Sequence, residues 1–310
     1  MKTAVITVAH GRHDHLRRQH EMLWRSTVQP DLYLVVAVDD PGLNTWRTCS
    51  PEARVIPFAG GHAGLPMADA RNAGAAEAIR SGAELLVFLD VDCLADEEMI
   101  QWYQRAAEHD EHGGSLLCGP VAYLPPPPAD GYALDRLSTH PFHRARPAPS
   151  AGALWSDGEH KLFWSLSFAV TREVWERVGG FCSEYRGYGA EDTDFAQAAK
   201  AAGVELTWVG GAAAYHQWHP TSSPPVQHVD DILRNGAIFA RRWGWWPMEG
   251  WLAQFVELGL VEVDESGAGY RRVGDGPSTG SGDVLSSPST GSGNGGPEKL
   301  MGLAPAGAER

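Results

Sequence analysis

The segment Leu85-Leu-Val-Phe-Leu-Asp90-Val-Asp92 decides how the rest of the chain is interpreted. Its five apolar residues predict a buried strand, and two carboxylates separated by one residue follow at the strand end. Divalent cations such as Mg²⁺ bind oxygen ligands, and ligands of open α/β sheets collect at the carboxyl ends of strands. An Asp-x-Asp pair is equally common in a turn or a helix cap, but Asp96 can cap the next helix. We therefore predict that Asp90 and Asp92 are free to bind a metal ion.

Short apolar runs alternate with helical patterns through the first part of the chain. The expected strands lie at residues 3–9, 32–38, 54–58, 84–89 and 115–123. The expected helices lie at residues 15–27, 66–81 and 96–109. This alternation predicts an α/β fold with a mainly parallel central sheet flanked by helices. Residues 9–12, 39–40 and 90–92 should then lie along one rim of the sheet, where ligands of such folds bind.

The second part of the chain has a different composition. Residues 124–150 are rich in proline and scattered polar side chains, which predicts a long irregular loop. Such a loop is either a lid over a binding site or a plain surface insertion, and the sequence leaves both open. Further strands are expected at 163–170 and 205–209, and further helices at 171–178, 192–202, 229–243 and 247–258. The Gly, Ser and Pro content of residues 274–310 predicts a disordered tail.

Composition limits the classes of function. The formal net charge of −14 argues against a nucleic-acid partner, because proteins that bind nucleic acids neutralise phosphates with basic patches. The four cysteines show no paired spacing, which favours a reducing cytoplasm. No stretch is long and apolar enough to span a bilayer, and the first apolar run is too short for a signal peptide. Peripheral membrane association through a lipid-linked acceptor remains compatible with this composition.

Two further clusters carry polar chemistry. In the segment Gly179-Gly-Phe-Cys-Ser-Glu-Tyr-Arg-Gly-Tyr-Gly189-Ala-Glu191-Asp192-Thr-Asp194, glycines precede three carboxylates at a helix start. Such carboxylates either cap the helix or take a proton from a hydroxyl group. His216 and His219 follow the last expected strand of the sheet, where they are either hydrogen-bonding residues or metal ligands. The residues alone leave both pairs of alternatives open.

The order of these motifs resembles the family-2 glycosyltransferases of the GT-A fold, over about residues 3 to 235. The segments that carry the resemblance are Val8-Ala-His-Gly-Arg12, Asp39-Asp40, Ala70-Arg-Asn-Ala-Gly74 and Leu89-Asp-Val-Asp92. The segment from Gly179 to Asp194, with the later His216, is similar to the acceptor segment of the galactosyltransferases. Residues 11–16 are similar to the turn of these enzymes that contacts the diphosphate.

The resemblance implies a role for each matching residue. The nucleotide would be held by His10, Arg12, Asp39, Asp40, Arg71, Asn72 and Asp90. The metal would be held by Asp92 with Asp90 and with His216 or His219. Asp192 would be the catalytic base together with Glu191, and the acceptor would lie against Trp164, Gly189 and Glu191.

The implied reaction is an inverting, metal-dependent transfer of a hexosyl group from a UDP-sugar to an acceptor hydroxyl. Mixed carboxylate and imidazole ligands suit Mn²⁺ better than Mg²⁺. The acceptor would be a carbohydrate, a glycolipid or a small molecule. Residues 1–123 would bind the nucleotide-sugar, 124–219 the acceptor, and 220–273 would close the fold with helices. A nucleotidyltransferase that makes sugar nucleotides and a non-catalytic sugar-binding module are the alternative interpretations.

Overall fold

The computed structural model describes residues 1–46, 52–61, 64–264 and 267–274. The predicted disordered tail, 274–310, lies outside this range except for Gly274, and so does Cys49. None of the described helices has the length and apolar character needed to cross a bilayer.

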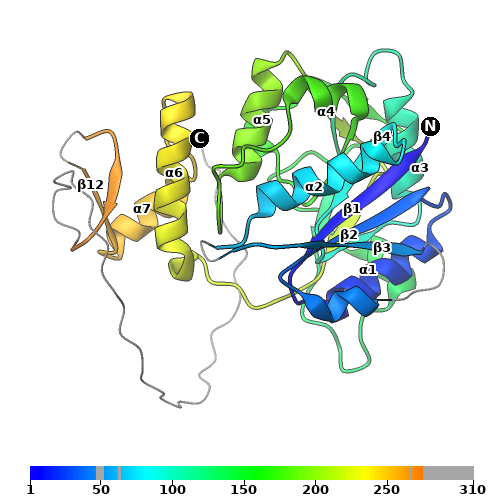
Figure 1. The fold of residues 1–310 in the computed structure, drawn as a ribbon, viewed down its shortest axis with the longest axis horizontal. Coiled ribbons are helices and arrows are strands. Elements are labelled where there is room, and N and C mark those ends of the chain that lie inside the picture. Colours follow the sequence, from blue (N-terminus) through cyan, green and yellow to red (C-terminus); the bar gives the residue numbers. More distant parts are fainter. Residues whose placement is uncertain (47–51, 62–63, 265–266, 275–310) are drawn as a thin grey trace.

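A large central sheet forms the middle layer of the described chain (Figure 1). Its strands run in the order β3 (Ala53–Phe58), β2 (Leu32–Val38), β1 (Thr3–Ala9), β4 (Leu85–Leu89), β9 (Ser167–Thr171), β6 (Leu116–Cys118), β10 (Leu206–Val209) and β8 (Leu154–Trp155). The first four strands are parallel, and Ile6 in β1 pairs with Leu34 and Phe88. Strand β9 is antiparallel to both of its neighbours, and β8 is an antiparallel edge strand. The prediction of a mainly parallel sheet is confirmed.

Helices cover both faces of this sheet (Figure 1). One face packs against α1 (His13–Arg25) and α3 (Met99–Ala107). The other packs against α2 (Met67–Arg80), α4 (Arg172–Val178) and α5 (Glu191–Ala201). Helix α2 approaches closely because Gly74 faces β1, where a Cβ atom would meet Ile6 Cγ2 at 2.5 Å. This close packing brings the side chains of α2 near the sheet rim.

A small second sheet lies beside the carboxyl end of β4. It contains β5 (Cys93–Ala95), β11 (Ala214–His216) and β7 (Val121–Tyr123). In its antiparallel pairing, His216 lies opposite Cys93, the residue after Asp92. The register of two short strands therefore joins two parts of the chain that are far apart in sequence.

Three predicted elements differ from the structure by three or more residues at one boundary or by a break within the element. The single strand predicted at 115–123 is two strands, β6 and β7, because Gly119 and Pro120 carry the chain from one sheet to the other. A side chain at Gly119 would collide with the carbonyl of Ala212. The strand predicted at 163–170 begins only at Ser167. The helix predicted from Asp96 begins at Met99, because the Asp96 carboxylate accepts hydrogen bonds from Glu98 N (3.0 Å) and from the hydroxyl of Tyr215 (2.7 Å).

The irregular segment 124–150 lies against the small sheet. It contains the 3₁₀ helix η2 (Leu134–Thr139) and a β-bridge between Phe142 and Ala122. Other short 3₁₀ helices are η1 (Pro41–Thr45), η3 (His160–Leu162) and η4 (Val226–His228). The last described elements are α6 (Val229–Trp243), α7 (Glu249–Glu257), β12 (Val261–Val263) and β13 (Tyr270–Arg272). Figure 1 shows α6, α7 and β12 together at one end of the molecule.

Candidate active site

Asp92, His216 and His219 form a three-residue cluster that can hold a metal ion. One ligand atom from each residue lies within 4.8 Å of the others. His216 Nε2 is 3.5 Å from Asp92 Oδ1, and His219 Nε2 is 3.4 Å from Asp92 Oδ2. The backbone N–H of Gln217, which follows His216, donates to the carbonyl of Asp92 at 2.7 Å. The β5–β11 pairing and this bond bring the three side chains together.

The protonation states in this cluster suit metal binding. Burial acts to raise the pKa of Asp92, but His219, His216 and Arg12 outweigh it and hold that pKa at about 2. Burial lowers the pKa of His216, and His219 adds to this effect, although the charge of Asp92 acts in the opposite direction. Asp92 is therefore ionised and His216 is neutral near pH 7, so both offer lone pairs. One carboxylate with two imidazoles fits a transition metal such as Mn²⁺ better than Mg²⁺.

Asp90 is bound by a buried arginine. Arg71, on α2, is 3% exposed and donates to Asp90 Oδ1 at 3.0 Å and to Glu191 Oε1 at 3.2 Å. Burial raises the pKa of Asp90 to about 6, although Arg71 works in the opposite direction. One guanidinium thus connects the end of β4 with the start of α5. The structure places Asp90 on this connection, and its role as a metal ligand stays a prediction.

Asp192 lies next to this connection, in the first turn of α5. Its Oδ1 atom accepts hydrogen bonds from the backbone N–H (2.7 Å) and the hydroxyl (3.3 Å) of Thr193. Burial and the negative charge of Glu191 raise the pKa of Asp192 to about 7, against the opposing effects of Thr193 and Arg71. A carboxylate with that pKa suits a general base at neutral pH.

The loop before α5 has an unusual backbone. Gly187, Gly189 and Ala190 have φ angles of 69°, 91° and 73°, in the left-handed region that favours glycine. Tyr188 between them is 41% exposed, and its ring stacks on His228 with centroids 4.4 Å apart. We did not predict Tyr188 as a site residue, although an aromatic residue between two glycines before a carboxylate pair is a readable signal.

Four of the residues predicted to bind the nucleotide follow β1 and β2, namely His10, Arg12, Asp39 and Asp40. Asp40 accepts hydrogen bonds from Gly11 N and His13 Nε2, both at 2.8 Å. Asp39 accepts one from Gly60 N at 3.0 Å, and His10 Nδ1 lies 2.8 Å from the carbonyl of Val38. These bonds order the turns at the rim.

Arg12 links this rim to the metal cluster. Its φ angle is 52°, and Nη1 lies 3.5 Å from Asp92 Oδ2. His15, on α1 and within the segment 11–16, was not predicted as a neighbour of the metal cluster, and its ring centroid lies 6.5 Å from that of His219. The positive charge of Arg12 therefore lies beside the metal cluster.

The side chain of Asn72 forms hydrogen bonds with the protein backbone. Its Nδ2 donates to the carbonyl of Phe181 at 2.8 Å, and its Oδ1 accepts from the N–H of Phe181 at 2.9 Å. Because both polar atoms bind the backbone, Asn72 fixes the start of the segment that leads to α5. Its predicted contact with a nucleotide stays a prediction.

Trp164 is the end of a row of aromatic contacts that reaches the metal cluster. Its ring contacts His143 (5.1 Å between centroids), His143 contacts Tyr123 (5.3 Å), and Tyr123 stacks on His216 (4.6 Å). The guanidinium carbon of the buried Arg146 lies 5.2 Å from the Trp164 ring centroid. The irregular segment 124–150 thus contributes His143 and Arg146 to the surroundings of the site.

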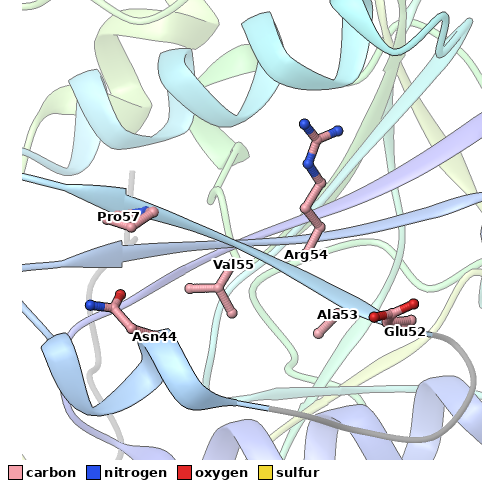
Figure 2. A pocket seen from close by; sticks show the side chains of 6 residues that line it. All are labelled: Asn44, Glu52, Ala53, Arg54, Val55 and Pro57. Atoms are coloured by element: carbon pink, nitrogen blue, oxygen red, sulfur yellow. The ribbon is translucent and has the colours of Figure 1, made fainter.

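A cavity of about 600 Å³ lies elsewhere, at the edge strand β3 (Figure 2). Its lining residues are Asn44, Glu52, Ala53, Arg54, Val55 and Pro57. None of these was predicted as a site residue, and Arg54 already pairs with Glu77 at 2.6 Å. The predicted site residues therefore lie outside this cavity.

Known proteins share parts of this arrangement. A family model described as the N-terminal domain of galactosyltransferase matches residues 157–220. Validoxylamine A glucosyltransferase of Streptomyces hygroscopicus subsp. limoneus is 26% identical over 226 residues, which are 66% of this chain and 49% of that protein. The crystal structure of GalNAc-T7 with UDP, GalNAc and Mn²⁺ superposes with a TM-score of 0.52 at 16% identity, over 78% of this chain and 50% of that chain.

This chain spans about half the length of both relatives. The structural likeness shows the fold, and the family model falls on the segment that contains Trp164, Glu191, Asp192 and His216. These findings confirm the GT-A fold and the resemblance to its glycosyltransferases, and they support an enzyme of the glycosyltransferase class.

Proposed function

We propose that the protein is an inverting, metal-dependent glycosyltransferase that moves a hexosyl group from a UDP-sugar to an acceptor hydroxyl. The single observation that carries this proposal is that two different kinds of site lie on connected parts of the chain. Asp92, His216 and His219 can hold a metal ion. Asp90, two residues before Asp92, binds Arg71, and Arg71 binds Glu191, the neighbour of Asp192, whose pKa is raised to about 7. A leaving-group site and a base site are what a single displacement needs.

On the donor side, Asp92 and the two histidines would hold the cation, and Arg12 would lie along the diphosphate. A divalent cation supplies Lewis-acid stabilisation of the negative charge that develops on a diphosphate leaving group. Arg12 adds a positive charge at the same edge, 3.5 Å from Asp92. The GalNAc-T7 structure, which holds UDP and Mn²⁺ in a related fold, supports this donor and this metal.

On the acceptor side, Asp192 would take the proton from the attacking hydroxyl. General-base assistance of this kind contributes about 10²–10⁴ in rate. Glu191 is committed to Arg71, so its negative charge acts by keeping the pKa of Asp192 high. Trp164 would offer its ring to the apolar face of an acceptor sugar, as aromatic side chains do with apolar surfaces.

The acceptor proposed here is a carbohydrate, a glycolipid or a small molecule. The relative named validoxylamine A glucosyltransferase supports a small-molecule acceptor. We also propose a cytoplasmic location, because Cys93, Cys118 and Cys182 are free thiols in the described part of the chain.

A panel of UDP-, GDP- and dTDP-hexoses with Mn²⁺, assayed by release of the free nucleotide, tests the proposal. We expect metal-dependent release of UDP from at least one UDP-hexose, with added glycosides accelerating it. Release that continues unchanged in EDTA contradicts metal dependence. Formation of a UDP-sugar and pyrophosphate from UTP and a sugar phosphate would identify a nucleotidyltransferase instead. Metal-independent sugar binding without any release would identify a binding module.

A further inference from the structure

Three backbone carbonyls of the loop before α5 converge on one side chain of α6. Asn235 is completely buried, and its Nδ2 donates to the carbonyls of Arg186 (2.9 Å), Tyr188 (3.2 Å) and Gly189 (2.9 Å). A side-chain amide has two N–H groups, so these bonds use its full donor capacity. The three acceptors lie within residues 186–189 of one loop, so the hydrogen bonds to Asn235 hold the path of that loop.

The path includes one backbone conformation that is unfavourable for its residue. Gly187 and Gly189 have positive φ angles, and so does Ala190, for which the left-handed region is unfavourable. The carbonyl of Ala190 then accepts the N–H of Asp194 at 2.8 Å, which is the first hydrogen bond of α5. The backbone held by Asn235 therefore sets where α5 begins, and Asp192 lies in that first turn.

Other side chains of α6 hold the same segment. Asp231 Oδ2 accepts the N–H of Tyr188 at 3.2 Å, and a side chain at Gly187 would collide with the Asp231 carboxylate. On the far side of Asp192, the buried carboxylate of Asp194 accepts hydrogen bonds from Arg242 Nε and Trp243 Nε1, both at 2.7 Å. Helix α6 thus contacts the segment before and after Asp192.

We propose that Asn235 is a positioning residue that fixes Asp192 relative to the metal cluster. The inference rests on the proposed function, because it assumes that Asp192 is the base. The metal ligands lie on the turn after β4 and near β11, so a shift of α5 moves Asp192 without moving them. Asn235 also lies beyond residue 220, where the match to the galactosyltransferase model ends.

The geometry predicts a specific pattern of losses. Misplacement of a catalytic group by about 1 Å lowers turnover by about 10²-fold, and donor binding does not depend on that group. Asn235→Asp turns a donor toward three carbonyls into an acceptor, and Asn235→Leu replaces the amide by a branched apolar group that can donate no hydrogen bond. We expect both variants to lose turnover and to keep the affinity for Mn²⁺ and UDP.

The experiment measures UDP release from the donor hexose identified by the panel, with water as acceptor, for four proteins. These are the wild type, Asn235→Asp, Asn235→Leu and the control Asp230→Asn. Asp230 is on the same helix, and its Oδ1 is 3.3 Å from Arg272 Nη1, away from the loop. We expect turnover about 10²-fold lower for both Asn235 variants and unchanged for the control. Mn²⁺ and UDP binding, followed by EPR and by thermal shift, should match the wild type in all three variants.

A double substitution separates positioning from general damage. If Asn235 acts through Asp192, Asn235→Leu should change turnover by no more than about twofold in an Asp192→Asn background. Multiplicative losses in that background, parallel loss of UDP binding, or full turnover in the single variants would each overturn the inference. If the Asn235 variants do not fold, Asp231→Asn replaces them. It should lower turnover in the wild-type background, by less than the Asn235 variants, and leave it nearly unchanged in the Asp192→Asn background. A wild type without any UDP release would instead contradict the proposed function itself.

Discussion

The metal cluster and the loop before Asp192 are built in opposite ways. The cluster joins Asp92 with His216 and His219, which lie far along the sequence, and strand pairing sets its geometry. The loop before Asp192 is a continuous segment of the chain, and hydrogen bonds to side chains of α6 set its geometry. The two regions meet at Arg71, which binds Asp90 on one side and Glu191 on the other. Donor binding and turnover should therefore respond to different substitutions.

The largest effect is expected at the cluster. Asp92→Asn removes the charge that both histidines and Arg12 face, so metal binding and turnover should fail together. We expect turnover to fall by about 10⁴-fold, the equivalent of several kcal/mol of lost stabilisation. Initial rates over a range of Mn²⁺ concentrations measure this. A variant that regains wild-type turnover at high Mn²⁺ would show that the carboxylate only raises metal affinity.

The next effect is expected at the base. Asp192→Asn keeps the size of the side chain and removes its basicity, so turnover should fall by about 10²–10³-fold. The affinity for UDP with Mn²⁺ should stay within about twofold of the wild type, because separate regions carry the two functions. Single-turnover rates and UDP titrations measure the two quantities. A loss of UDP affinity as large as the loss of turnover would contradict the claim that separate regions carry the two functions.

The pH dependence should report the base and not the cluster. The pKa of Asp192 is raised to about 7, so the carboxylate is protonated and inactive below that pH. Turnover should rise with pH about tenfold per unit below pH 7 and level off above it, and Asp192→Asn should lack this rise. The folded state retains this proton more strongly than the unfolded chain, so this group lowers stability as pH rises from about 4 to 7. A flat profile from pH 6 to 8 for the wild type would contradict the assignment.

The smallest effect on turnover is expected for Arg71, which connects the two regions, when turnover is measured above pH 8. Arg71→Met leaves the mostly buried carboxylates of Asp90 and Glu191 without their partner, which should lower the free energy of unfolding by about 3–5 kcal/mol. Because Arg71 lowers the pKa of Asp192, the midpoint of the turnover profile should move upward. Urea unfolding and the pH profile measure these changes. Unchanged values of both would show that the connection has no energetic role.

Much of the fold was readable in the sequence because its signals are local. Apolar strands that end in carboxylates predicted the parallel sheet and the positions of Asp90 and Asp92 along its rim. Gly119-Pro120 interrupts the strand predicted at 115–123, and a glycine followed by a proline is a local signal for such a break. The helices at 229–243 and 247–258 were predicted, whereas the hairpin of β12 and β13 was not, since its strands are only three residues long.

The pairings within the site could not be predicted in the same way. The sequence marks Arg71, Asp90 and Glu191 as charged residues, but which carboxylates the arginine binds depends on how α2 packs against β4 and α5. Asn72 and Asn235 illustrate the same limit. An amide binds a nucleotide and a backbone carbonyl with the same atoms, so its partner is decided by tertiary contacts.

The central claim, that one region binds the metal with the donor and the other supplies the base, has a direct test. Mn²⁺ binding is measured by EPR, with and without UDP, for the wild type, Asp92→Asn and Asp192→Asn. We predict that UDP strengthens Mn²⁺ binding in the wild type and in Asp192→Asn, and that Asp92→Asn loses this binding. Retention of UDP-linked Mn²⁺ binding by Asp92→Asn, or its loss in Asp192→Asn, would contradict the claim.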